Sequence, residues 1–148
     1  MTTSLEKVKE FHKAFSAPIS DKPTAGTQQH RKLRVALIAE ELCELCEALG
    51  VTLTVYANKV TWIEAHPDAS KVDLVGVADA LGDLDYVVQG ANLTFGMPAE
   101  EVMQEIHRSN MAKLGPDGVP IRRPDGKILK PDGWTPPDLK TIVERASK

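Results

Sequence analysis

The stretch EELCELCE, residues 40–47, sits within a long apolar-periodic segment that we predict to be one helix, residues 28–49, ended by Gly50. It places four carboxylates within eight positions. The sequence has no Lys or Arg between Arg34 and Lys59 that could pair with them, and like charges at such helical spacing repel. This stretch is therefore either a solvated acidic stripe or a wall that binds cations.

A helical wheel shows where these acids lie relative to the buried face. With Glu40 at zero and ~100° per residue, Glu44 falls at ~40°, Glu47 at ~340° and Glu41 at ~100°. The leucines and isoleucine of the segment centre near ~170° on the same wheel. Glu41 thus lies on the shoulder of the apolar arc, where a plain solvated stripe has no reason to place a carboxylate.

Residues 73–95 form a second apolar-periodic segment that carries acids, closed by Gly96. With Asp79 at zero, Asp83 falls at ~40° and Tyr86 at ~340°, so the three share one stripe. Gly82 and Gly90 lie inside this predicted helix, where each costs about 1 kcal/mol relative to alanine. Such glycines are expected where another backbone or a ligand comes close.

If the two helices pack antiparallel, four or more carboxylates converge. Carboxylate oxygens without histidine or thiolate suit a hard cation such as Mg²⁺ or Mn²⁺. The alternative, two independent solvated faces, stays open because charge runs on helices are usually surface.

The other segments are predicted to be mostly helical. We expect a helix over 4–15 capped by Ser4, a helix over 53–66 because no strand partner is evident nearby, a helix over 98–114 and a short one over 139–146. Three PDG triplets between residues 115 and 138 predict a small hairpin or wrapping loop. The predicted fold is therefore all-α: a bundle of four or five helices in a single domain, 1–148, with core 28–114 and C-terminal arm 115–148.

Composition limits the environment and the partners. A chain of 148 residues with 42% hydrophobic content makes one ordinary domain, and a net charge of −3 disfavours nucleic-acid binding. No apolar run approaches the ~18 residues of a membrane span, and the N-terminus is charged where a signal peptide is apolar. The two cysteines, Cys43 and Cys46, are interpreted as reduced thiols packed along a helix. These features predict a cytoplasmic protein.

The 98–114 segment carries charge complementary to a phosphate. His107, Asn110 and Lys113 recur along one edge; Lys113 suits a phosphate, and Asn110 can donate to and accept from a sugar or base. A surface lysine and a helix-end asparagine are the plainer interpretation. Lys127 and Lys130 in the arm are candidates to close over phosphates. Trp62 could stack on a base, but a packed core side chain is the favoured interpretation.

The residues EELCE resemble the EExxE signature of the all-α nucleoside triphosphate pyrophosphatases: the MazG-like proteins, the dimeric dUTPases and phosphoribosyl-ATP pyrophosphatase. DALGD, residues 79–83, stands where the ExxD half of that signature is expected. HRSNMAKLG and the arm that follows resemble a MazG-like, phosphoribosyl-ATP-pyrophosphatase-like subgroup. The similarity runs from roughly residue 28 to 140. One departure is that the usual ExxD glutamate falls at Ala80.

This resemblance implies a set of roles. Glu41, Glu44 and Asp83 are the implied metal ligands, with Asp79 in place of the missing glutamate. Two or three Mg²⁺ or Mn²⁺ ions are implied, with cleavage between the α and β phosphates. The general base is predicted to be Glu47, with Glu40 second. The resemblance supports Asn110 and Lys113 as substrate-binding residues. Their positions in the sequence add Tyr86, His107, Lys127 and Lys130 as candidates to bind the substrate.

The resemblance also implies a homodimer, in some relatives paired again into tetramers. The substrate is expected to be dUTP, by analogy with the dimeric dUTPases. Two alternatives remain: hydrolysis of phosphoribosyl-ATP, and a non-catalytic helical regulatory module disabled by the missing glutamate.

Overall fold

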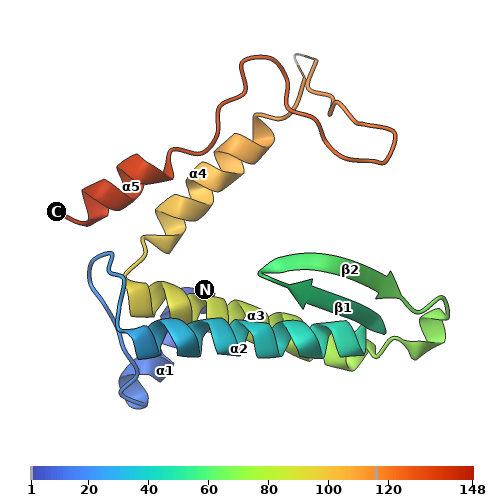
Figure 1. The fold of residues 1–148 in the computed structure, drawn as a ribbon. Helices are drawn as coiled ribbons and strands as arrows, with labels where there is room; N and C mark the ends of the chain where they lie inside the picture. The colour runs from blue at the N-terminus through green and yellow to red at the C-terminus, as the bar shows by residue number, and fades with distance from the viewer. Residues whose placement is uncertain (1, 116) are drawn as a thin grey trace. The chain divides into compact units, whose positions relative to one another are not determined.

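The computed structural model describes residues 2–115 and 117–148, which form two compact units, Met1–Gly96 and Met97–Lys148 (Figure 1). The first of the three PDG triplets begins at Pro116, so the predicted turn at that residue lies outside the described residues.

The first unit is organised around two long antiparallel helices. These are α2 (Gln28–Ala48) and α3 (Leu74–Phe95), which match the predicted helices closely (Figure 1). The Thr27 side chain caps the first of them by accepting from the His30 N–H, 3.1 Å away. Gly96 ends α3 in the left-handed conformation, at φ 62°, and a Cβ there would collide with the Lys22 carbonyl. The predicted stop at Gly96 is therefore confirmed.

The helix α1 (Ser4–Ala14) packs on α3. Its cap is Thr3 and not the predicted Ser4: the Thr3 hydroxyl accepts from the Glu6 N–H at 3.2 Å, and the Glu6 carboxylate accepts from the Thr3 N–H at 2.7 Å. With Thr3 as the cap, Ser4 is the first residue of the helix.

The segment between α2 and α3 contradicts the all-α prediction. Residues 53–66 do not form a helix; β1 (Val51–Tyr56) and β2 (Lys59–Ala65) pair as an antiparallel hairpin (Figure 1). The strand partner lies in the same segment, across a two-residue turn at Ala57 and Asn58, which have φ of 48° and 61°. Two β-branched runs separated by two residues are a hairpin signal, and here it decided the structure. The fold is mixed, helices plus a two-stranded sheet.

The hairpin has one apolar face and one mixed face. Leu53 pairs with Ile63, and Thr54 with Trp62; paired residues share a face. Trp62 is therefore on the mixed face and is 59% exposed, so the expectation of a core tryptophan is wrong. A short 3₁₀ helix, Ala69–Lys71, leads from the hairpin to α3.

The second unit contains α4 (Ala99–Met111), the arm and α5 (Leu139–Ala146). Trp134 ties the arm to α4, since its indole N–H donates to the Ser109 carbonyl at 2.8 Å, and the Ser109 hydroxyl donates to the Thr135 carbonyl at 3.1 Å. Isolated bridges within the arm join Leu114 to Pro120 and Arg122 to Ile128. They produce small hairpin-like turns of the kind that the PDG triplets predict.

The buried apolar core is small. Among the described residues the fully buried apolar side chains are Val8, Ala80 and Leu93. Across residues 2–115 and 117–148, no helix combines the length and apolar character that a membrane span requires.

Candidate metal and phosphate site

Two close approaches fix the register between α2 and α3. A Cβ on Gly90 would lie 2.7 Å from Arg34 Nη1, and one on Gly76 would lie 3.2 Å from the Ala48 Cβ. Fourteen residues along α2 thus correspond to fourteen residues back along α3. Glu41 and Asp83 stand midway between these two contacts, one on each helix. Because antiparallel helices advance by the same rise per residue, these two residues lie at the same level along the pair.

Glu41 is a carboxylate of the first unit that loses solvent and lies near other acids. Its Oε2 is buried and has no hydrogen-bond partner among the described residues. Loss of solvent raises the pKa of Glu41 above its ordinary value, and the negative charges of Glu44, Asp83, Glu40 and Asp79 raise it further. The predicted convergence of acids from both helices is therefore visible in the electrostatics of this one side chain.

Ala80 occupies the position on α3 where the ExxD pattern has its glutamate. Its methyl side chain is buried, so this position contributes no carboxylate. Asp79, one position earlier, is exposed and contributes the neighbouring carboxylate.

An acidic cavity of about 470 Å³ opens between the end of α2 and the start of α3. Its lining residues are Glu44, Glu47, Ala48, Asp73, Gly76 and Asp79. Asp73 was not among the predicted site residues. Its Oδ1 accepts from the Val75 N–H at 3.0 Å and so caps α3. In the sequence, the only indication of this role is that Asp73 is an acid directly before the apolar-periodic residues of α3.

The donor set suits a hard divalent cation, because it consists of carboxylate oxygens and includes an orphaned buried oxygen. These carboxylates are not yet close enough to one another to bind a metal ion. Among the residues that the structure describes, no three His, Cys, Asp or Glu side chains have the geometry of a metal site. Side-chain rotation of the exposed Glu44 and Asp79 is the movement that a cation would require.

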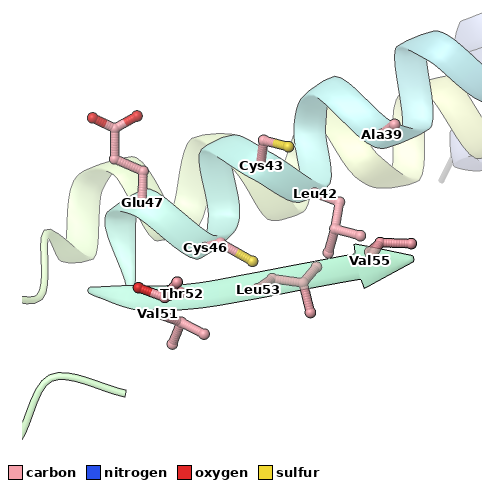
Figure 2. A pocket seen from close by; sticks show the side chains of 9 residues that line it. All are labelled: Ala39, Leu42, Cys43, Cys46, Glu47, Val51, Thr52, Leu53 and Val55. Carbon is pink, nitrogen blue, oxygen red and sulfur yellow. The ribbon is translucent and has the colours of Figure 1, made fainter. Parts of the chain in front are cut away.

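A second cavity, also about 470 Å³, lies between α2 and β1 and is mainly apolar (Figure 2). Figure 2 shows Leu42 and Cys46 of α2 and Leu53 of β1 directed into it, while the Glu47 carboxylate points away from the strand. Cys43 and Cys46 both line this cavity as free thiols, Cys43 exposed and Cys46 partly buried. Glu47 lines both cavities, so it stands at the border between apolar and acidic surface.

The helix α1 packs on α3 through an aromatic contact and lies against the buried Arg34 of α2. Tyr86 meets the ring of Phe11 edge-on at 5.6 Å between centroids. The buried Arg34 donates to His12 Nε2 at 3.3 Å, and His12 Nδ1 donates to the Pro18 carbonyl at 2.8 Å. Burial is the main cause that lowers the pKa of His12, and the charge of the neighbouring Arg34 lowers it further. Sequence periodicity gave no signal for this buried pair.

The remaining predicted substrate residues lie in the second unit. Lys113 Nζ donates to Asn110 Oδ1 at 2.7 Å, so the predicted edge brings these two together, and His107 is exposed one turn earlier on α4. Lys130 Nζ lies 3.9 Å from the centroid of the Trp134 ring. Lys127 is exposed in the arm, and its backbone N–H donates to Asp125 at 3.1 Å.

Comparison with known protein families relates this chain to enzymes that hydrolyse a nucleotide triphosphate chain. A family model described as phosphoribosyl-ATP pyrophosphohydrolase matches residues 8–110, which include α2, α3 and nearly all of α4. A search of curated proteins found no match.

Proposed function

The chain belongs to the phosphoribosyl-ATP pyrophosphohydrolase family, and we propose that it is a metal-dependent nucleoside triphosphate pyrophosphohydrolase with dUTP as its favoured substrate. The observation that carries this proposal is the buried, partnerless Oε2 of Glu41 amid the carboxylates of α2 and α3. Burying a carboxylate oxygen among other negative charges lowers the free energy of unfolding, unless a cation binds there and offsets the charge.

The proposed ligands are Glu41, Glu44, Asp79 and Asp83, holding two or three Mg²⁺ or Mn²⁺ ions. When bound, such ions offset the negative charge of the phosphates and lower the pKa of coordinated water. The carboxylates of this chain hold the cations and, through them, fix where the triphosphate lies.

Glu47 is proposed to take the proton from the attacking water, with Glu40 as the second choice. The water oxygen forms a bond to the α-phosphorus as the bond to the bridging α–β oxygen breaks. The products are the nucleoside monophosphate and pyrophosphate. Glu47 suits the role because it is exposed, lines the acidic cavity and is not one of the proposed ligands.

The substrate contacts are proposals for each unit by itself. Tyr86 is proposed to contact the sugar or a phosphate from α3. The proposed contacts of the second unit are His107, Asn110, Lys113, Lys127 and Lys130. The Asn110–Lys113 pair supports this, since one positive charge and one amide are already held side by side at the end of α4.

We extend the proposal to a homodimer, which can pair again into a tetramer. Its support is the small set of fully buried apolar side chains among the described residues, set against a chain of 148 residues. A second copy supplies the apolar surface that one chain lacks.

A second candidate substrate is phosphoribosyl-ATP, which the name of the matched family favours. It carries the same triphosphate, so the same carboxylates and the same bond cleavage apply. A third possibility is a helical regulatory module that binds nucleotides without hydrolysing them.

The test is an assay of the purified protein with dUTP, the other common nucleoside triphosphates and phosphoribosyl-ATP, each with Mg²⁺ or Mn²⁺. Pyrophosphate and orthophosphate are measured separately. Release of pyrophosphate from dUTP above the other substrates supports the proposal, and turnover of phosphoribosyl-ATP alone supports the second candidate. Absence of product with either metal refutes both enzymatic functions.

A further inference from the structure

Three exposed aromatic side chains gather where α1 packs on α3. The rings of Phe11 and Phe15, one turn apart at the end of α1, are stacked with 4.3 Å between their centroids, and the Phe11 ring meets the Tyr86 ring edge-on at 5.6 Å. Phe11 and Tyr86 are partly open to solvent, and Phe15 is 70% exposed. These three residues are called the aromatic cluster. Because aromatic rings gain much from leaving water, an open cluster of this kind marks a surface that a ligand can cover.

The aromatic cluster continues the acidic stripe of α3. Tyr86 follows Asp83 by three residues, which is ~4.5 Å along the helix axis, and it stands ~20° around that axis from Asp79. Asp79 and Asp83 lie near enough to Glu41 to raise its pKa, so the stripe borders the proposed metal site. The aromatic cluster therefore begins about one helical turn beyond the proposed metal ligands.

The end of α1 holds the Phe15 ring in place. The Phe15 N–H donates to the Phe11 carbonyl at 2.9 Å, and the Ala17 N–H donates to the carbonyl of the buried His12 at 2.8 Å. Phe11 covers one face of the Phe15 ring, so the other face is the exposed one. A ring fixed in advance loses little conformational entropy when a flat ligand stacks on it.

Packing is the plainer role for such rings. It accounts for Phe11, which touches Tyr86 and joins α1 to α3. It does not account for Phe15, whose ring partner among the described residues is Phe11 alone and whose side chain lies mostly in solvent. The open face of Phe15 is therefore the part of the aromatic cluster that packing leaves unexplained.

A nucleoside triphosphate has two chemical parts that match this arrangement. Its phosphates are anionic and bind through cations to the carboxylates, whereas its base is a flat aromatic ring that one sugar joins to the phosphates. Bases stack on aromatic side chains, and stacking tolerates any base because every base has a π face. The aromatic cluster thus suits the base of dUTP and of phosphoribosyl-ATP alike.

We infer that the base of the nucleotide stacks on the open face of Phe15, with Phe11 supporting that ring and Tyr86 beside the sugar. This base subsite rests on the proposed function and adds the residues that receive the base. Phe11 and Phe15 bind the substrate and take no part in proton transfer. The subsite raises the affinity for nucleotides without selecting one base over another.

The test measures the binding of two probes by calorimetry in the presence of Mg²⁺. One probe is inorganic triphosphate, which has no base, and the other is a dUTP analogue with an NH group in place of the α–β bridging oxygen. The wild-type protein is expected to bind the analogue more tightly than triphosphate. Phe15→Ala should weaken binding of the analogue by roughly 5- to 150-fold, the range for loss of one stacked base, and leave the affinity for triphosphate unchanged.

Tyr56→Ala is the matched control, because Tyr56 is an exposed aromatic residue of the hairpin outside the aromatic cluster. It is expected to change neither affinity. Phe15→Trp keeps a flat ring and should retain the affinity for the analogue. The fluorescence that Phe15→Trp adds to that of the wild type should be quenched by the analogue and not by triphosphate. If Phe15→Ala does not fold, this quenching decides alone.

Three results overturn the base subsite and leave the proposed hydrolysis standing: equal affinity of the wild type for the two probes, unchanged affinity of Phe15→Ala for the analogue, or no quenching of Phe15→Trp. Equal loss of both probes in a folded Phe15→Ala protein also overturns it, because the ring then acts on phosphate binding and not on the base. A wild-type protein that binds neither probe, with Mg²⁺ or with Mn²⁺, overturns this inference together with the proposed function.

Discussion

Arg34 and Gly90 meet across the contact between α2 and α3, so closely that a Cβ on Gly90 would lie 2.7 Å from Arg34 Nη1. The buried guanidinium rests against the α3 backbone and donates to His12, which brings three helices to one point. The same contact sets the register that places Glu41 opposite Asp83. Gly90 is therefore a structural requirement of the acidic site, seven residues away from it.

Gly90→Ala is expected to destabilise the protein by about 1–3 kcal/mol, because the new methyl group overpacks a buried contact. Gly82→Ala in the same helix is the control. Within the described residues nothing lies within 4 Å of a Cβ at Gly82, so alanine there should add up to ~1 kcal/mol through helix propensity. Urea unfolding at fixed protein concentration measures both. Equal effects of the two variants would contradict the close packing at Gly90.

Glu41→Gln is expected to stabilise the metal-free protein at neutral pH. The pKa of Glu41 is raised above its ordinary value of 4.5 by burial and by the neighbouring carboxylates. A raised carboxyl pKa means that ionisation destabilises the folded state, and this loss sets in as pH rises above the ordinary value. The neutral amide removes that loss. Thermal unfolding in the presence of a chelator at pH 7 should show a higher midpoint than in the wild type.

Added Mg²⁺ should make the wild-type protein more stable than the Glu41→Gln variant. At a Mg²⁺ concentration about 100-fold above its dissociation constant, binding stabilises the wild-type protein by about 2.7 kcal/mol, and Glu41→Gln should lose most of that gain. Glu10→Gln on α1 is the matched control, expected to respond to Mg²⁺ as the wild type does. Unchanged stabilisation in Glu41→Gln would remove Glu41 from the ligand set.

Glu47→Gln is expected to lower turnover by about 10²–10⁴-fold while retaining metal-induced stabilisation, as removal of a general base does. Glu64→Gln, an exposed acid of the hairpin, is the control and should keep normal turnover. The readouts are pyrophosphate release and the thermal shift with Mg²⁺. Full turnover in Glu47→Gln would transfer the role to Glu40.

The second unit should lose stability in acid between about pH 4.5 and pH 2. Hydrogen bonds from Arg108 first, and from the Asp138 N–H, lower the pKa of Glu105 to about 2 from an ordinary value of 4.5. A depressed carboxyl pKa stabilises the folded state above the ordinary value, and the effect is lost as pH falls through the folded value. The fluorescence of Trp134 in a Trp62→Phe background should report this transition. Glu105→Gln should flatten it.

Ala57→Gly is expected to stabilise the hairpin by ~0.5–1 kcal/mol. Ala57 has a φ of 48°, a left-handed conformation that costs a residue with a Cβ about 1–2 kcal/mol and costs glycine little. Proteolysis within residues 51–65, followed by mass spectrometry, should slow. Ala65→Gly, at the end of β2 and outside the turn, is the control and should not slow it.

The long helices were predictable because their signals are local. Glycine after each helix and apolar periodicity along it predict α2 and α3 to within a residue or two. The wheels also placed Glu41 on the shoulder of the apolar arc of one helix and Asp83 on a stripe with Asp79 on the other. Composition and periodicity could reach this far because both helices are long and strongly patterned.

The hairpin was missed although its signal was present. Val51–Tyr56 and Lys59–Ala65 are β-branched runs on either side of a two-residue turn, but the turn reads Ala-Asn and lacks the glycine that usually marks it. Trp62 was expected in the core because large aromatic side chains are usually packed there, whereas in the hairpin it is 59% exposed. The Trp62 side chain therefore lies at the surface of the hairpin and not in the interior.

By itself the sequence determined which residues are acidic, which segments are helical and that the two acid-bearing helices share a pattern. Only the tertiary structure decided that Arg34 is buried against Gly90, that Ala80 is buried and that Asp73 joins the acidic cavity. These depend on which side chains meet across helices far apart in the chain. Helical periodicity fixes a residue's direction around its own axis, whereas the axial register between two helices is set by close packing, which no single segment contains.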